Sequence, residues 1–204
     1  KHKNKTHLQK ELGLPVSAGR PLLGMVTRLV EQKGLDLVLH VLEEILALEV
    51  QVVLLGSGER RYEEAFMEMA QGHPRQLSVN LGFSEDLAHQ IYAGSDLFLM
   101  PSKFEPCGLS QMIAMTYLSL PVVRETGGLK DSVTAYNRFT GEGTGFSFAN
   151  YNAHEFLFTV KEAVSLYREK ADTWQDLTRQ AGAVDFSWTH SALAYKALYG
   201  KIRG

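Results

Sequence analysis

Apolar patterns typical of strands and of helices alternate along the first 149 residues, and this alternation restricts the fold more than any other feature. Leu22–Thr27 and Val50–Leu55 are typical of short buried strands, and Leu35–Leu48 between them has apolar residues on most faces, as a largely buried helix does. Further strands are predicted at 77–81, 96–100, 121–124 and 145–148, and further helices at 60–70, from 84 onward and at 108–118. Strand–helix units of roughly 20–30 residues indicate right-handed crossovers and a parallel, doubly wound, Rossmann-like α/β sheet.

After residue 149 the pattern becomes purely helical, with predicted helices at 152–170, 172–183 and 189–202. In the last of these, Leu193, Leu198 and Ile202 are spaced for packing. We therefore predict one domain over residues 1–204, with an α/β core at about 1–170 and a C-terminal helical tail at 171–204.

Composition excludes several classes of partner. The net charge of −2 gives no electrostatic reason to expect nucleic acid. No window approaches about 18 consecutive apolar residues, so no membrane span is expected. A single cysteine allows no internal disulfide, which fits a cytoplasmic protein. The chain opens on Lys1 with a basic segment and no initiator methionine, and we expect it to be a domain of a larger protein.

Charged, glycine and aromatic residues gather where the predicted strands end. In open parallel sheets, ligands bind outside the carboxyl ends of the strands, so this edge is the expected site. The edge collects Thr27-Arg28, Gly56–Gly58, Gly82-Phe83, Pro101–Gly108 and Thr126–Gly128.

Two cations flank the loop that follows the first predicted strand. Arg28 and Lys33 together can neutralise a diphosphate, although a solvated loop with incidental charge is the alternative. Phe83 can offer a ring face to a base, but an aromatic residue at a strand end is as often part of the core. The Gly56–Gly58 turn is a weak signal, because Arg61 occupies the third glycine position of the dinucleotide fingerprint, which argues against an NAD domain.

Residues 101–109 place one carboxylate, Glu105, before a glycine-containing turn and a predicted helix start. Free N–H groups and the positive end of a helix dipole attract anions. Gly108, Leu109 and Ser110 are therefore interpreted as hydrogen-bond donors to a phosphate, through their backbone and one hydroxyl. Glu105 is then placed to contact sugar hydroxyls or the charge that develops at an anomeric carbon; an exposed loop acid in an ion pair is the alternative. A sugar nucleotide has both kinds of group.

Cysteine and metal chemistry have little support in the sequence. Cys107 lies near a predicted helix start, but no histidine lies close in sequence to act as its base. No Cys or His pair has ligand spacing, and the chain carries no HExxH, CxxC, G-x-S-x-G or Walker motif. No metal and no cofactor are expected.

Several of these segments together resemble the C-terminal half of bacterial glycogen synthases and plant starch synthases. The likeness runs from about Asn4 to Tyr199, and F-E-P-C-G-L followed by T-G-G-L is its most specific part. The segments that carry it are Arg28–Asp36, Leu55–Gly58, Gly82-Phe83, Pro101–Leu109 and Glu125–Leu129.

The resemblance implies a retaining GT-B glycosyltransferase, built from two Rossmann-like domains with the active site between them. The implied reaction transfers glucose from ADP-glucose to the non-reducing end of an α-1,4-glucan, with retention. This chain would hold the nucleotide sugar, and the missing N-terminal domain would supply much of the glucan site, so the isolated chain is expected to be inactive. The lysine- and glycine-rich motif near the start of the full enzymes is absent here.

The resemblance also assigns roles by position. Arg28 and Lys33 would contact the diphosphate and, with Glu105, carry catalysis, while Phe83 would stack on adenine. The remaining expected nucleotide-sugar contacts are Gly58, Cys107, Gly108, Leu109, Ser110 and Thr126, of which Cys107 and Gly108 would offer amides to the glucose hydroxyls and Leu109 and Ser110 would bind phosphate.

Two positions depart from the family pattern. Ile113 stands where many retaining GT-B families carry a second acid, which weakens any two-carboxylate scheme. Leu118 stands where the family usually has glycine, so we expect that helix end to cap differently. Two alternatives stay open at this point: another retaining GT-B transferase of the sucrose or trehalose type, which would use UDP-glucose, and a non-catalytic nucleotide-binding module.

Overall fold

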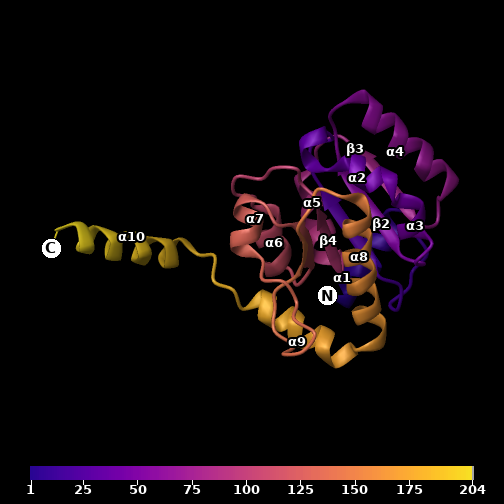
Figure 1. The fold of residues 1–204 in the computed structure, drawn as a ribbon. Coiled ribbons are helices and arrows are strands. Elements are labelled where there is room, and N and C mark those ends of the chain that lie inside the picture. Colours follow the sequence, from indigo (N-terminus) through magenta and orange to yellow (C-terminus); the bar gives the residue numbers. More distant parts are fainter. Residues whose placement is uncertain (204) are drawn as a thin grey trace.

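The computed structural model describes residues 1–203 and shows six parallel strands in one sheet with helices on both faces (Figure 1). Along the sheet the strands run in the order β3-β2-β1-β4-β5-β6. Their bounds are β1 Leu22–Val26, β2 Gln51–Gly56, β3 Leu77–Leu81, β4 Leu97–Met100, β5 Leu120–Arg124 and β6 Phe146–Phe148. The order reverses between β1 and β4, where a doubly wound sheet opens its ligand crevice. The predicted fold class is confirmed.

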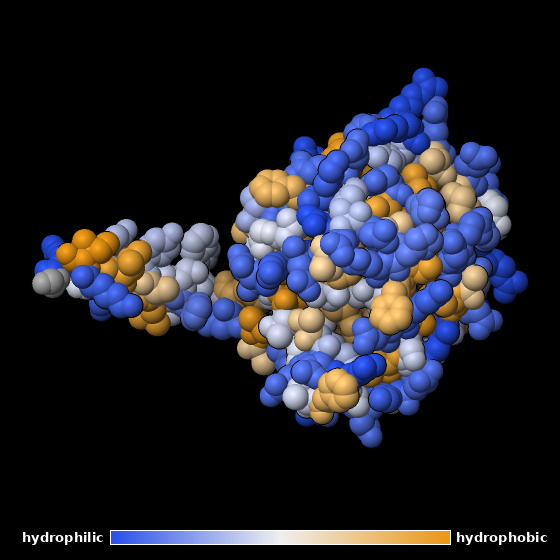
Figure 2. Space-filling model, in the orientation of Figure 1, coloured by the Kyte–Doolittle hydropathy of each residue, from blue (hydrophilic) through white to orange (hydrophobic). Residues whose placement is uncertain are grey.

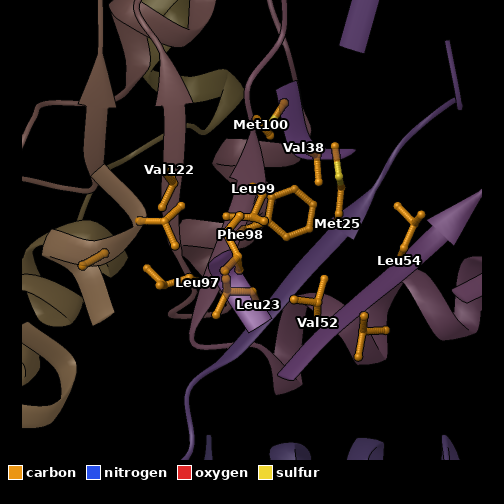
Figure 3. Close-up of a cluster of buried hydrophobic side chains, with 14 of the residues drawn as sticks. Leu23, Met25, Val38, Val52, Leu54, Leu97, Phe98, Leu99, Met100 and Val122 are labelled. Atoms are coloured by element: carbon orange, nitrogen blue, oxygen red, sulfur yellow. The ribbon is translucent and has the colours of Figure 1, made fainter. Parts of the chain in front are cut away.

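The four central strands are apolar along most of their length because helices cover both of their faces. Met25, Leu54, Phe98, Leu99 and Val122 are among the buried side chains that fill the space on either side of the sheet (Figure 3). The sheet is therefore a rigid platform whose carboxyl edge holds the loops in place.

Helices that follow β1 and β2 share one face with the long helix α8, and helices that follow β3, β4 and β5 cover the other face together with the N-terminal helix (Figure 1). The first group is α2 Leu35–His40, α3 Leu42–Leu46, α4 Arg60–Gly72 and α8 Ala153–Glu169. The second group is α1 His2–Glu11, α5 Glu85–Gly94, α6 Ser110–Thr116 and α7 Gly127–Ser132. Helix α9, Ala171–Gly182, contacts both α8 and α6.

The single helix predicted over residues 35–48 is wrong. Val41 takes φ −120° and ψ 15°, so the chain turns there and forms α2 and α3 instead. Apolar residues on most faces indicate burial, but they do not mark the point at which a buried helix changes direction. The helix predicted over 108–118 is also shorter, since α6 begins at Ser110 and ends at Thr116.

Helix α6 ends in the ordinary way, which contradicts the expectation of a different cap. Ser119 N–H bonds the Ala114 carbonyl at 2.8 Å and Leu118 N–H bonds the Met115 carbonyl at 2.9 Å, the two hydrogen bonds of a Schellman motif. Leu118 takes the left-handed conformation that glycine normally supplies, with φ +60°. The leucine thus accepts a backbone conformation that costs an L-residue about 1 kcal/mol or more.

Helix α10, Trp188–Arg203, projects away from the rest of the chain (Figure 1), and none of its residues is buried. Apolar surface is visible along the projecting helix in Figure 2. Its exposed large apolar side chains are Trp188, Leu193, Tyr195, Leu198, Tyr199 and Ile202.

Candidate functional site

A cavity of about 180 Å³ lies at the carboxyl ends of β1 and β4, where the strand order reverses. Its walls come from the two strand ends, the loop after β1 and the loop between β4 and α6. The lining residues are Met25, Val26, Thr27, Arg28, Lys33, Leu99, Met100, Ser102, Glu105, Gly108, Leu109 and Ser110. The site therefore forms where the sheet topology predicts a ligand crevice.

Lys33 and Glu105, which are 72 residues apart in sequence, form an ion pair in this cavity. Lys33 Nζ lies 2.5 Å from Glu105 Oε2, and the two side chains are only 18% and 10% exposed. Ser102 Oγ donates to the same carboxylate oxygen at 3.3 Å. Glu105 is thus a buried, charge-compensated carboxylate, and the ammonium group of Lys33 keeps further donors for a ligand.

Two glycines let the loops that carry these residues approach each other backbone to backbone. A β-carbon at Gly34 would lie 2.0 Å from the Pro101 carbonyl oxygen, and one at Gly128 would lie 2.1 Å from the Cys107 carbonyl oxygen. Gly128 N–H also donates to the Glu105 carbonyl at 3.1 Å. The loop after β1 and the Thr126–Gly128 turn therefore each pack closely against the backbone of the Glu105 loop.

A second cavity of about 340 Å³ adjoins the first along the same edge of the sheet. Val26, Thr27 and Arg28 line both cavities. Leu55, Gly56, Ser57, Gly82 and Phe83 complete the second one. Phe83 is 88% exposed, so it belongs to the open rim and not to the core.

Arg28 stands between the two cavities as an exposed cation. Within residues 1–203 no ion pair includes its guanidinium group, in contrast to Lys33. Sequence interpretation treated the two cations alike. The structure distinguishes an available guanidinium from an ammonium that is already bonded to a carboxylate.

The other predicted residues lie at different distances from the cavities. Gly108, Leu109 and Ser110 line the first cavity. Burial raises the pKa of Tyr92, and its hydroxyl donates to Ser110 Oγ at 3.1 Å. The oxygen of Ser110 is thereby used as an acceptor, which leaves its own O–H free to donate.

Gly58, Cys107 and Thr126 are not among the residues that line the two cavities. Gly58 N–H already bonds Glu63 Oε1 at 2.8 Å. Cys107 is exposed on the turn before α6, and Thr126 occupies the position before α7. These residues stay predicted ligand contacts.

Sequence reasoning missed Ser102 and Arg124. Ser102 touches Glu105, and Arg124 Nε donates to the Ser102 carbonyl at 2.9 Å. Arg124 ends the strand β5, so the rule that places ligands at carboxyl ends of strands also pointed to its position. No signal in the chain marked Ser102 as more than a loop residue.

Comparison with known proteins shows the family. Residues 10–181 match the family described as "Glycosyl transferases group 1". The chain belongs to this family. It is 54% identical over 202 residues to a glycogen synthase from Desulfitobacterium hafniense and 55% identical over 202 residues to one from Bacillus cereus, covering 99% of this chain in each case. The resemblance to glycogen and starch synthases is thereby confirmed.

A solved structure agrees with the sequence relatives. The catalytic domain of starch synthase IV from Arabidopsis thaliana, bound to ADP and acarbose, matches with a TM-score of 0.90 and 40% identity over 98% of this chain. This chain covers 42% of that structure and 43% and 42% of the two glycogen synthases. It therefore spans less than half the length of the relatives it matches. None of the helices in residues 1–203 is long and apolar enough to cross a membrane.

Proposed function

We propose that this chain is the donor-binding half of a retaining glycogen or starch synthase, which transfers glucose from ADP-glucose to the non-reducing end of an α-1,4-glucan. One observation carries the proposal: two adjoining cavities along the carboxyl edge of the sheet share Arg28, with a buried carboxylate at one end and an exposed aromatic ring at the other. A nucleotide sugar presents a polyol, a diphosphate and a base in the same order.

In the proposed complex, the base lies in the second cavity against Phe83 and the glucose lies in the first. The diphosphate meets Arg28, whose guanidinium group matches phosphate oxygens in a bidentate fashion. Gly108 and Leu109 line the first cavity beside this position. The starch synthase structure that contains ADP favours ADP as the nucleotide, since it shares the fold of this chain at 40% identity.

Departure of ADP leaves positive charge on the sugar ring and negative charge on the diphosphate. Arg28 stabilises the leaving diphosphate, and Lys33 can add to this because its ammonium group has three donors. The Glu105 carboxylate lies 2.5 Å from Lys33 and stabilises the sugar side of the transition state. Because no second acid stands at Ile113, catalysis in this proposal is mainly electrostatic and positional.

The acceptor glucan is proposed to bind mainly through the N-terminal half of the longer protein. The isolated chain would then bind ADP or ADP-glucose weakly and transfer almost no glucose. Robust elongation of a glucan by the purified chain would contradict this assignment. A cytoplasmic location stays a prediction, and glycogen synthase relatives from bacteria favour it.

The test is a calorimetric titration of the purified chain with ADP, UDP and NAD in parallel. Preference for ADP is the expected result, and it would support the synthase assignment and the role of Phe83. Preference for UDP would move the assignment to another retaining GT-B transferase. If no nucleotide binds, the same titration of the full-length protein separates an incomplete site, where ADP binds again, from a module that binds none.

A further inference from the structure

Arg124 lies behind the candidate site and holds the loop that carries Glu105. Its Nε donates to the Ser102 carbonyl at 2.9 Å, and its Nη2 donates to the Lys103 carbonyl. The side chain is not among those that line either cavity. One guanidinium group at the end of β5 therefore fixes two successive carbonyls of the Glu105 loop.

Tyr151 bonds to helix α2, which directly follows the loop that carries Lys33. Its hydroxyl donates to Asp36 Oδ1 at 2.5 Å, the short distance typical of an O–H bonded to a carboxylate. Asp36 lies in the first turn of α2, three residues after Lys33. Burial, together with the Asp36 carboxylate, raises the pKa of Tyr151 well above its ordinary value, so the hydroxyl stays a donor.

The ring of Tyr151 joins these two sets of contacts. Arg124 Cζ and Lys103 Nζ each lie 5.7 Å from the ring centroid, within the range of a cation–π contact. Tyr151 itself comes from the segment between β6 and α8, which is not adjacent in sequence to either of the two loops. A third segment therefore bridges the Lys33 loop and the Glu105 loop.

Direct bonds between the two loops complete the arrangement. Lys103 N–H donates to the Gln32 carbonyl at 2.9 Å, and Gln32 Nε2 donates to the Phe104 carbonyl at 3.1 Å. Lys103 Nζ also bonds Glu31 Oε1 at 3.0 Å. These three bonds are made by the residues just before Lys33 in one loop and just before Glu105 in the other.

We propose that Tyr151 and Arg124 are positioning residues that hold Lys33 and Glu105 in register for glucosyl transfer. The proposal rests on the proposed function. Neither residue is assigned a contact with the substrate; each acts through loops that must keep a 2.5 Å ion pair aligned. A displacement of about 1 Å at a reacting centre can cost about 100-fold in rate, so loss of the bridge is expected to lower kcat.

The experiment compares Tyr151→Phe with the wild type in the full-length protein. The variant keeps the ring and removes the hydroxyl, and we expect kcat to fall about tenfold while KM for the glucan stays unchanged. Asp36→Asn weakens the same bond, so the double variant should be no slower than the slower single variant. Arg124→Lys keeps the charge but loses the fork, and it should also lower kcat about tenfold.

Tyr167→Phe is the matched control. The Tyr167 hydroxyl donates to the Ala18 carbonyl at 2.8 Å and accepts from Lys5, at the opposite edge of the sheet. A loss of stability alone would affect both tyrosine variants, whereas a positioning role predicts that only Tyr151→Phe lowers kcat. An equal loss of kcat in Tyr151→Phe and Tyr167→Phe would overturn the proposal.

Hydrogen exchange of the Lys103 amide provides a readout that does not depend on turnover. We expect exchange to be about tenfold faster in Tyr151→Phe and unchanged in Tyr167→Phe. A wild-type protein that transfers no glucose would contradict the proposed function, and the exchange rates would still decide whether Tyr151 orders the loop. Wild-type kcat or wild-type exchange in Tyr151→Phe would overturn the positioning role.

Discussion

Arg28 is the residue that both cavities share, and its guanidinium group is exposed to any ligand that spans them. Arg28→Ala should weaken ADP binding about 10–100-fold, because charge-assisted hydrogen bonds contribute about 1.5–3 kcal/mol each. Arg28→Lys keeps the charge but loses the bidentate geometry of the guanidinium group, so its affinity for ADP should lie between those of the wild type and Arg28→Ala. Calorimetric titration with ADP measures these affinities. The control is Arg179→Ala, which replaces an exposed arginine on α9. Unchanged affinity in Arg28→Ala would refute the diphosphate assignment.

Leu118 offers a second test at the residue scale, because its backbone has φ +60°. Leu118→Gly and Leu118→Ala lose similar side-chain contacts, but only alanine keeps the strained β-carbon. We expect the glycine variant to be more stable than the alanine variant by about 1 kcal/mol, or about 2–4 °C in Tm. Urea unfolding measures the difference.

Glu68, exposed on α4, is the matched position for this comparison because its backbone is helical. There the order should reverse, with glycine less stable than alanine by about 1 kcal/mol. If alanine is more stable than glycine at position 118 as well, the left-handed conformation of Leu118 carries no strain.

At the scale of elements, helix α1 depends on a buried ion pair. Lys5 Nζ lies 2.6 Å from Asp96 Oδ2, with the side chains 2% and 8% exposed, and the pair joins α1 to the start of β4. Lys5→Met should lower the free energy of unfolding by about 3–5 kcal/mol, because it leaves a buried carboxylate without its partner. Denaturant unfolding measures this loss.

A double variant separates the ion pair from simple packing. Asp96→Asn added to Lys5→Met removes the orphaned charge, so the double variant should lose less stability than the sum of the two single variants. Strict additivity would show that the two charges do not stabilise each other.

The same helix shows why the sequence predicted some elements and not others. Strands and the helices that pack on them carry apolar patterns, and these patterns predicted the sheet correctly. Helix α1 buries Lys5 and Gln9 as well as Leu8, and its polar residues are stabilised by partners that lie far away in sequence, Asp96 and Gln51. A local pattern does not contain that information.

The site divides in a similar way. Arg28 and Glu105 follow strands, so the topology rule alone placed them on one edge. The contact between Lys33 and Glu105 depends on loops that meet at Gly34 and Pro101, which no spacing in the sequence predicts. The same is true of Arg124 and Tyr151, because their significance lies in the backbone that they hold.

At the scale of the whole molecule, α10 is the part of the chain whose packing partner is not explained by the Rossmann-like domain. Leu193, Tyr195 and Leu198 are each at least half exposed, and no residue of the helix is buried. Relatives are more than twice as long as this chain. We therefore predict that α10 packs on the other half of the full-length protein.

Deletion of residues 187–204 from the isolated chain and substitutions on α10 in the full-length protein test this prediction. In the isolated chain, Tm should change by less than about 2 °C, because the helix buries nothing against the domain. In the full-length protein, Leu198→Asp should lower both Tm and glucosyl transfer, because it would place a charge in a buried apolar contact. Lys196→Asp, which also introduces an acid on α10, is the control for charge alone. If the two substitutions have equal effects in the full-length protein, the apolar face of α10 does not dock on the other half.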